Sequence, residues 1–133
     1  LAYANLDKVE LNILMSKYLE DEVARYDLVT YAESFVKTQD KEVAGKIAHT
    51  GVIELFTDTT CFFCNGTGQL VFNDSVDKCL HCHNGIFVWS DFSRSAIMGL
   101  KKGVYMKIKK DYKELMNHLI DVEQSALEKL GDT

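Results

Sequence analysis

Hydrophobic positions recur with helical spacing near the start of the chain. The first stripe comprises Leu11, Leu14, Met15, Tyr18 and Leu19. This spacing predicts a helix over residues 5–25, with Asn5 as its N-cap and Asp7 in its first turn. Asp27 is then predicted to cap a shorter helix that ends near Lys37.

A further apolar stripe follows Asp40, which suits the start of a third helix. The stripe comprises Val43, Ala44, Ile47, Ala48, Val52, Leu55 and Phe56. Apolar side chains at this spacing indicate packing in a core, and we expect all three helices to share one core. His49 lies one position beyond the stripe and is predicted to be exposed.

After residue 60 the helical spacing of apolar residues gives way to short apolar runs. Residues 69–72 and 86–89 are short β-prone runs, which are expected to form ribbons. The apolar side chains available to this segment are few, and they are Phe62, Phe63, Leu70, Val71, Phe72, Leu80, Ile86 and Phe87. A core of this size predicts that the segment needs a further source of stability.

Helical periodicity returns after residue 90. A cluster of helix-starting residues at 90–93 predicts a short helix over residues 92–100, and Gly103 is expected to cap it in a turn with Lys101 and Lys102. A long helix is predicted from Val104 onward. Its apolar stripe comprises Ile108, Tyr112, Leu115, Leu119, Val122, Ala126 and Leu127.

All four cysteines of the chain lie between the two helical regions, as two Cys-x-x-Cys pairs. The pairs are Cys61 with Cys64 and Cys79 with Cys82. This spacing is typical of a structural zinc site, in which four thiolates surround one ion. We therefore predict one Zn2+ bound by these four side chains, and a zinc-finger segment that depends on the metal for its stability.

Other uses of the four cysteines are possible. Two disulfides would require an oxidising compartment, which nothing in the sequence indicates. A thioredoxin-like redox pair would require a βαβ context, which is absent. An iron–sulfur centre uses the same ligands and is not distinguished by the spacing. His81 and His83 flank Cys82 and are expected outside the ligand set.

These patterns predict a mainly α fold and a single domain over residues 1–133. The N-terminal helices occupy 1–60, the zinc finger is inserted at 61–89, and a helix-turn-helix-like segment occupies 90–130. The absence of proline favours long helices. No run of about 18 apolar residues predicts a membrane span, and no signal peptide is evident, so we expect a cytoplasmic protein.

Charge is distributed unevenly along the chain, whose net charge is −5. Residues 1–60 carry six basic and eleven acidic side chains, whereas residues 91–113 carry seven basic and two acidic ones. A basic helix that follows a short helix and a turn is the outline of a DNA-binding helix-turn-helix. The alternative is a solvated helical hairpin whose lysines only keep it soluble. The predicted DNA-binding residues are Arg94, Lys101, Lys102, Tyr105, Lys107, Lys109, Lys110 and Lys113.

In its order of parts, the chain resembles the lambda-type Q late-gene transcription antiterminators of bacteriophages. The resemblance covers roughly residues 40–120. It rests on residues 61–68, on residues 79–82 with Gly85, on residues 93–96, and on Ile108, Lys109 and residues 112–115.

The resemblance implies a function in transcription rather than catalysis. Such proteins bind a double-stranded DNA element in a phage late promoter and engage paused RNA polymerase that still holds its sigma factor. They then make the polymerase read through terminators, in the bacterial cytoplasm. No nucleophile–base pair, phosphate-binding glycine loop or carboxylate dyad is recognisable, so we expect neither enzymatic activity nor a small-molecule substrate. The acidic side chains Glu20, Asp21 and Glu22 and the end of the zinc ribbons are the expected polymerase contacts.

Two other classes remain open from the sequence. Residues 61–68 match the repeat of the zinc region of Hsp40-type chaperones, although that region uses several such repeats. A zinc-stabilised helical module that binds only protein is the other alternative, with the acidic N-terminal surface as its interface. Strong salt-dependent affinity for DNA would distinguish the antiterminator hypothesis from these two alternatives.

Overall fold

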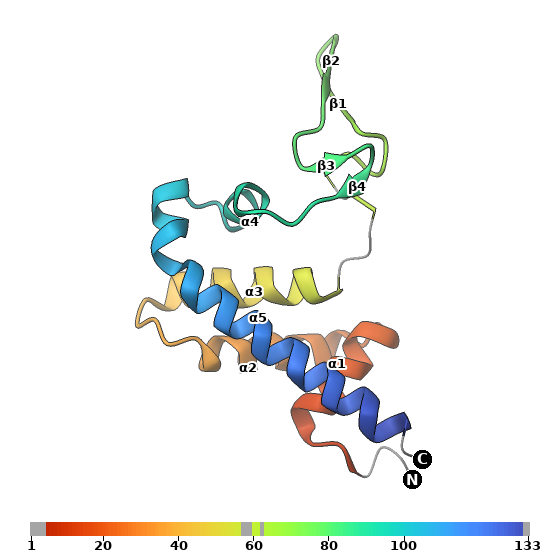
Figure 1. Ribbon diagram of the computed structural model, residues 1–133, viewed down its shortest axis with the longest axis vertical. Coiled ribbons are helices and arrows are strands. Elements are labelled where there is room, and N and C mark those ends of the chain that lie inside the picture. Colours follow the sequence, from red (N-terminus) through yellow and green to blue (C-terminus); the bar gives the residue numbers. More distant parts are fainter. Residues whose placement is uncertain (1–4, 57–59, 62, 132–133) are drawn as a thin grey trace. The chain divides into compact units, whose positions relative to one another are not determined.

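The computed structural model of the protein describes residues 5–56, 60, 61 and 63–131, and this part is mainly helical (Figure 1). The chain forms two compact units. We call residues 1–56 and 108–133 the helical unit, and residues 57–107 the cysteine unit. The mainly α prediction is confirmed. The cysteine unit is larger than the predicted insertion at 61–89, because it also contains a short helix and the start of the last helix.

The first helix of the helical unit, α1, spans Lys8–Tyr18. Its N-cap is Asp7 in a reciprocal capping box: the Glu10 amide donates to the Asp7 carboxylate at 2.8 Å, and the Asp7 amide donates to Glu10 at 2.9 Å. The predicted N-cap at Asn5 is therefore wrong. So is the predicted extent to residue 25, because the chain leaves the helix at Glu20, whose φ of 54° is left-handed.

The second helix, α2, spans Glu22–Phe35. Asp21 caps it by accepting a hydrogen bond from the Ala24 amide at 3.0 Å. The prediction that Asp27 begins this helix is wrong, since Asp27 lies inside it. The residue that follows the break at Glu20 is in the capping position, and Asp27 is not.

The third helix, α3, spans Lys41–Phe56, and its start at Asp40 is confirmed. The Asp40 carboxylate accepts hydrogen bonds from the Glu42 and Val43 amides. His49 is exposed, as predicted.

The last helix, α5, spans Lys102–Gly131 and belongs to the helical unit from residue 108. The helical unit has an extended buried core, which includes Ile13, Leu14, Leu28, Ala32, Ile47, Val52, Tyr112, Leu115, Leu119 and Ala126. These residues confirm most of the predicted apolar stripes. Tyr18, Leu19 and Leu127 are exceptions, because their side chains are exposed.

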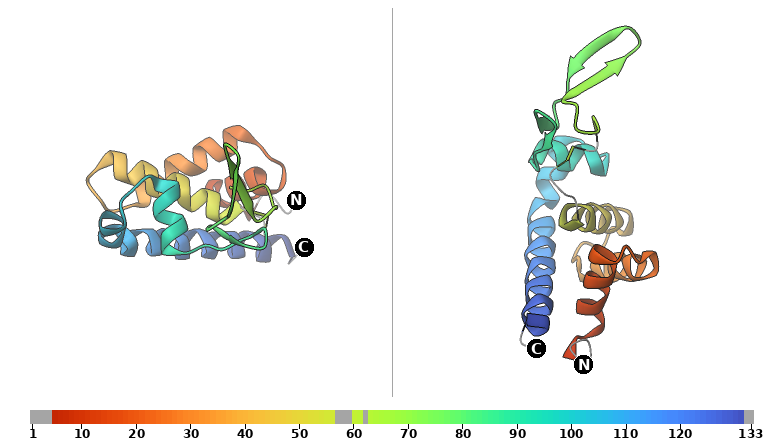
Figure 2. Two further views of the ribbon diagram at one scale, coloured as in Figure 1. Left: turned by 90° about the horizontal axis from the view of Figure 1, so that it is seen from above. Right: turned by 90° about the vertical axis from the view of Figure 1, so that its right-hand side faces the viewer.

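Polar pairs join α1 to the C-terminal half of α5, and the first and last helices lie near each other in the helical unit (Figure 2). Glu10 is buried and accepts hydrogen bonds from Lys129 Nζ at 2.7 Å and from Ser125 Oγ at 2.8 Å. Lys17 lies 2.7 Å from Glu123. Burial acts to raise the pKa of Glu10, but the Asp7 amide, Lys129 and Ser125 stabilise the carboxylate and bring the pKa down to about 2.

The cysteine unit contains two short antiparallel hairpins. Strand β1 (Gln69–Phe72) pairs with β2 (Ser75–Lys78), and β3 (Cys82–His83) pairs with β4 (Ile86–Phe87). Ribbons are thus confirmed, and each predicted run pairs with its own sequence neighbour. The run predicted to reach residue 89 ends at Phe87 as a strand.

The core of the cysteine unit is smaller than the sequence predicts. Phe87 is buried, and Phe63 and Leu70 are half-buried against the cysteines. Four of the predicted core side chains are exposed instead, namely Val71, Phe72, Leu80 and Ile86. Among the described residues each hairpin is a two-stranded sheet, and these side chains lie on its exposed side or, for Leu80, in the turn before β3. Phe62 lies outside the described residues.

Helix α4 spans Asp91–Met98 in the cysteine unit. Ser90 caps its start together with Ser93, and Gly99, with a left-handed φ of 68°, ends it. The prediction of Gly103 as the cap is wrong, because α5 already begins at Lys102 and contains Gly103. Within the described residues, no helix is long and apolar enough to cross a membrane.

Candidate metal centre

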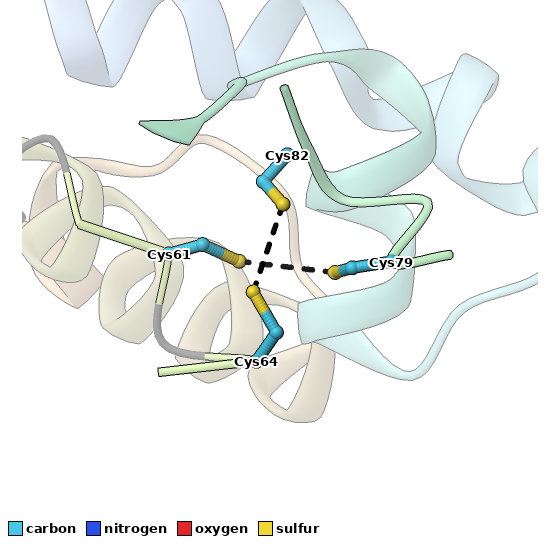
Figure 3. Close-up of side chains that lie close together, drawn as sticks. All are labelled: Cys61, Cys64, Cys79 and Cys82. Atoms are coloured by element: carbon cyan, nitrogen blue, oxygen red, sulfur yellow. Dashed lines mark hydrogen bonds between the residues drawn. The ribbon is translucent and has the colours of Figure 1, made fainter. Parts of the chain in front are cut away.

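The four cysteines converge on one point within the cysteine unit (Figure 3). Cys61 and Cys64 flank the turn after α3, Cys79 follows β2, and Cys82 opens β3. All four Sγ atoms lie within 4.8 Å of one another. The Cys61–Cys79 sulfur distance is 4.0 Å and the Cys64–Cys82 distance is 3.6 Å.

These distances suit four thiolates around one ion. Four sulfurs placed tetrahedrally at about 2.3 Å from a metal lie about 3.8 Å apart. Disulfide bonding would bring sulfurs to about 2.05 Å, and all four cysteines are free. The predicted ligand set is therefore assembled, and the cluster could hold a metal ion.

The backbone of the two Cys-x-x-Cys turns holds the sulfurs in place. The Gly68 amide donates to Cys64 Sγ at 3.2 Å, which orients that sulfur. The Cys61 amide donates to the Gly85 carbonyl at 2.8 Å, and the Cys79 amide donates to the Gly68 carbonyl at 2.9 Å. These bonds tie the two turns to each other.

Glycine is required at position 85. Gly85 has a left-handed φ of 89°, and a Cβ placed there would lie 2.2 Å from the carbonyl oxygen of Gly66. No L side chain fits this approach without moving the backbone. The sequence therefore permits the two turns to come close enough for a single four-sulfur cluster.

The thiols of the cluster differ in pKa. Burial raises the pKa of Cys61. Burial acts in the same direction on Cys64, but hydrogen bonds from the Gly68 amide and from neighbouring cysteines outweigh it and lower the pKa to about 6. The pKa of Cys82 is raised to about 12, by burial and then by the neighbouring cysteines. Because metal ligands are thiolates, binding an ion must release protons from the cluster.

The two flanking histidines lie outside the cluster, as predicted. The His81 ring is stacked between Phe63, at a centroid distance of 3.9 Å, and Phe92, at 5.0 Å. Its Nδ1 is buried without a hydrogen-bond partner among the described residues, and burial lowers its pKa. His83 is exposed. His81 thus packs behind the cluster as part of an aromatic stack.

The predicted DNA-binding side chains divide into two groups. Five are exposed along the turn and the N-terminal half of α5, and they are Lys101, Lys102, Lys107, Lys110 and Lys113. Lys109 is half-buried. Arg94 has only 20% of its side chain exposed and lies 3.9 Å from Asp91. Its guanidinium is therefore engaged within the unit.

Tyr105 requires a correction. Its side chain is fully buried, and its hydroxyl donates to Asp91 at 3.3 Å. The prediction that Tyr105 contacts DNA bases is wrong for this arrangement, because the ring faces the interior and fastens α5 to α4. The sequence signal was ambiguous, since Tyr105 is seven residues before Tyr112 and so continues the apolar stripe of α5 toward its start.

Comparisons with protein-family models, with curated proteins and with solved structures found no match to this chain.

Proposed function

We propose that this protein is a zinc-stabilised, sequence-specific DNA-binding factor that promotes transcription antitermination. In this proposal the cysteine unit and the exposed lysines of α5 engage a late-promoter DNA element. The helical unit engages RNA polymerase. The proposal combines the geometry of the site with the resemblance to lambda-type Q antiterminators.

Zinc is the proposed metal because the site offers four sulfurs and no oxygen ligand. One ion at the centre accounts for sulfurs that all lie within 4.8 Å of one another. A cluster of several bridged irons would hold its cysteines farther apart. Zn2+ would be held by Cys61, Cys64, Cys79 and Cys82, and it would supply folding stability rather than redox chemistry. Elemental analysis should find one zinc per chain, and iron in its place would contradict the assignment.

The observation that carries the DNA-binding proposal is the set of exposed lysines at the start of α5. Lys107, Lys110 and Lys113 are spaced by three residues and therefore share one side of the helix. Across the described part of the chain, no ion pair engages these three side chains, Lys101 or Lys102. Five unpaired cations along about three helical turns form a surface suited to phosphates.

Stability does not explain this placement. The N-terminal end of a helix carries partial positive charge and favours acidic side chains. The first turn of α5 contains no acidic residue and begins with Lys102. Lys102 in this position weakens the helix slightly, so helix stability does not account for it, whereas a polyanionic ligand would.

The test is the salt dependence of binding to late-promoter DNA. The log–log slope of affinity against salt should be about −0.9 per phosphate contact. Replacing Lys101 and Lys102 by Ala should reduce the magnitude of this slope by the contribution of about two phosphate contacts. The matched control replaces the exposed lysines Lys8 and Lys41 of the helical unit and should leave the slope unchanged. An unchanged slope in the Lys101/Lys102 variant would place the DNA contacts elsewhere.

Antitermination needs a second surface that stays with the moving polymerase. The helical unit supplies exposed acidic side chains at Glu20 and Glu22. Asp21 is unsuitable for this role because its carboxylate caps α2. We expect Glu20→Lys with Glu22→Lys to keep promoter binding and to reduce terminator read-through in a purified transcription system. The absence of read-through by the wild-type protein would contradict the antitermination proposal.

A protein-binding module without DNA affinity is the second candidate. It is favoured by the β1–β2 hairpin, on which Val71, Phe72 and Val76 are 66%, 61% and 58% exposed. Asp74 and Asp77 lie on the same hairpin, which makes it a poor match for phosphates. Salt-independent, negligible affinity for any DNA would favour this candidate over the first.

A further inference from the structure

An open apolar groove lies between α1 and the C-terminal end of α5, within the helical unit. It encloses about 240 Å³ and is lined by Leu14, Met15, Tyr18, Leu19, Leu127 and Leu130. Tyr18, Leu19 and Leu127 are 55%, 69% and 43% exposed. Clustered apolar side chains that face solvent in this way are typical of an interaction site.

The fold itself does not require these side chains to be apolar. The contact between α1 and α5 is already secured by Glu10 with Lys129 and by Lys17 with Glu123. The apolar core of the unit lies deeper, at residues such as Ile13 and Leu119, which are fully buried. The exposed lining of the groove adds little to that core.

The border of the groove is negatively charged. The two nearby lysines, Lys17 and Lys129, are each neutralised by a glutamate at 2.7 Å. Glu20 and Glu128 directly follow the lining residues Leu19 and Leu127 in the chain; both are exposed, and neither forms an ion pair within the described residues. A ligand of this groove therefore meets an apolar floor with unpaired carboxylates beside it.

We infer that this groove binds an amphipathic helix of a partner protein, with apolar side chains in the groove and Lys or Arg side chains along its flanks. Helices dock in grooves of this kind through a few apolar anchors, and the carboxylates select a basic flank. Nucleic acid would be repelled by the same carboxylates. A second copy of this chain would bring a second acidic border against the first, which disfavours self-association through the groove.

The inference rests on the proposed function for the identity of the partner, which is then RNA polymerase. The probe is purified bacterial RNA polymerase holoenzyme in the absence of DNA. Leu19→Lys with Leu127→Lys should weaken polymerase binding at least about tenfold. The two substitutions place cations in the apolar groove, where they would repel the basic flanks of the bound helix. Tyr26→Lys, at an equally exposed apolar position outside the groove lining, should change affinity by less than about twofold.

A photo-crosslinking amino acid at position 18 identifies the occupant. The expected product joins this position to a basic amphipathic helix of the polymerase, and the Leu19/Leu127 variant should lose it. Equal binding by the wild-type protein and the Leu19/Leu127 variant would overturn the groove as the docking site and leave the proposed function standing. Crosslinks only to a second copy of the chain would also overturn it. Failure of the wild-type protein to bind polymerase at all would instead remove both the partner and the groove proposal.

Discussion

The two units of this protein are held together by different means. The helical unit buries leucines, isoleucines and valines from all of its helices, with Leu28, Ile47, Leu115 and Leu119 fully buried. The buried cluster of the cysteine unit consists of Cys61, Cys64, Cys79 and Phe87, with a few half-buried neighbours. Apolar burial therefore stabilises the first unit, whereas the second is organised around four sulfurs.

The cysteine unit has little apolar core, and a metal held by its four sulfurs would take the place of one. Two-stranded hairpins are marginal in water, and each of the two hairpins described in the cysteine unit packs only one or two side chains against the cysteine cluster. It exposes more of its large apolar side chains than it buries, Val71, Phe72, Val76 and Leu80 among them. Such a segment needs a strong crosslink between its two Cys-x-x-Cys turns to stay folded. A metal ion bound by the four sulfurs would provide that crosslink.

The largest expected effect is that of a chelator, which would remove the metal proposed for the four-cysteine cluster. Chelation should unfold residues 61–89 while α1, α2 and α3 keep their structure, because structural zinc contributes about 10–16 kcal/mol to the folding of small sites. Hydrogen exchange read out by mass spectrometry separates the two units. Protection should be lost in β1–β4 and retained in α3.

Cys79→Ser should reproduce the effect of the chelator. Serine is a poor zinc ligand, and this position is buried in the cluster. Loss of protection throughout the helical unit on chelation would mean that the two units fold as one, which would break the comparison.

A smaller effect is expected from the buried carboxylate of the helical unit. Glu10→Gln removes one partner of the Lys129 pair and should cost about 2 kcal/mol, less than a fully buried pair because Lys129 is partly exposed. Thermal unfolding at neutral pH measures the cost.

The same variant has a defined pH dependence. The folded-state pKa of Glu10, about 2, lies below its ordinary value of 4.5. Its stabilising contribution is therefore complete above pH 4.5 and is lost as the pH falls toward 2. The difference in stability between wild type and Glu10→Gln should shrink over this window. A difference that stayed constant down to pH 2 would show that the carboxylate charge is not the source of the stability.

The smallest effect is expected on the β1–β2 hairpin. Val71 and Val76 face each other across the strands and are exposed, so replacing both by Thr should change stability by less than about 0.5 kcal/mol. Phe87→Ala, which removes the buried ring beside the cysteines, is the matched contrast and should cost about 3 kcal/mol. Thermal unfolding of the metal-bound protein measures both. A large loss in the Val71/Val76 variant would show that the hairpin contributes a core of its own.

The sequence predicts the parts of this structure that repeat a simple pattern. The start of α3 at Asp40 and the apolar face of α5 follow from helical spacing. The cluster of Cys61, Cys64, Cys79 and Cys82 follows from two short motifs whose internal spacing leaves few other arrangements.

The remaining features depend on contacts that a linear pattern does not contain. The break between α1 and α2 occurs at Glu20 without glycine or proline, so the local signal is only Asp21, which looks no different in the sequence from Asp27 as a helix cap. Gly99 and Gly103 are both plausible helix ends, and Gly99 is the one with the left-handed backbone. The burial of Tyr105 depends on its position opposite Asp91, which only the folded unit brings together.

One aromatic contact allows tryptophan fluorescence to report on one unit separately from the other. Trp89 is the single tryptophan of the chain, and its ring packs edge-on against Phe87 with centroids 4.7 Å apart. It belongs to the neighbours of the four cysteines. Indole emission is sensitive to its surroundings, so fluorescence excited selectively at tryptophan reports on the cysteine unit alone. The native chain thus carries its own optical probe of the candidate metal centre, and a metal titration needs no attached dye.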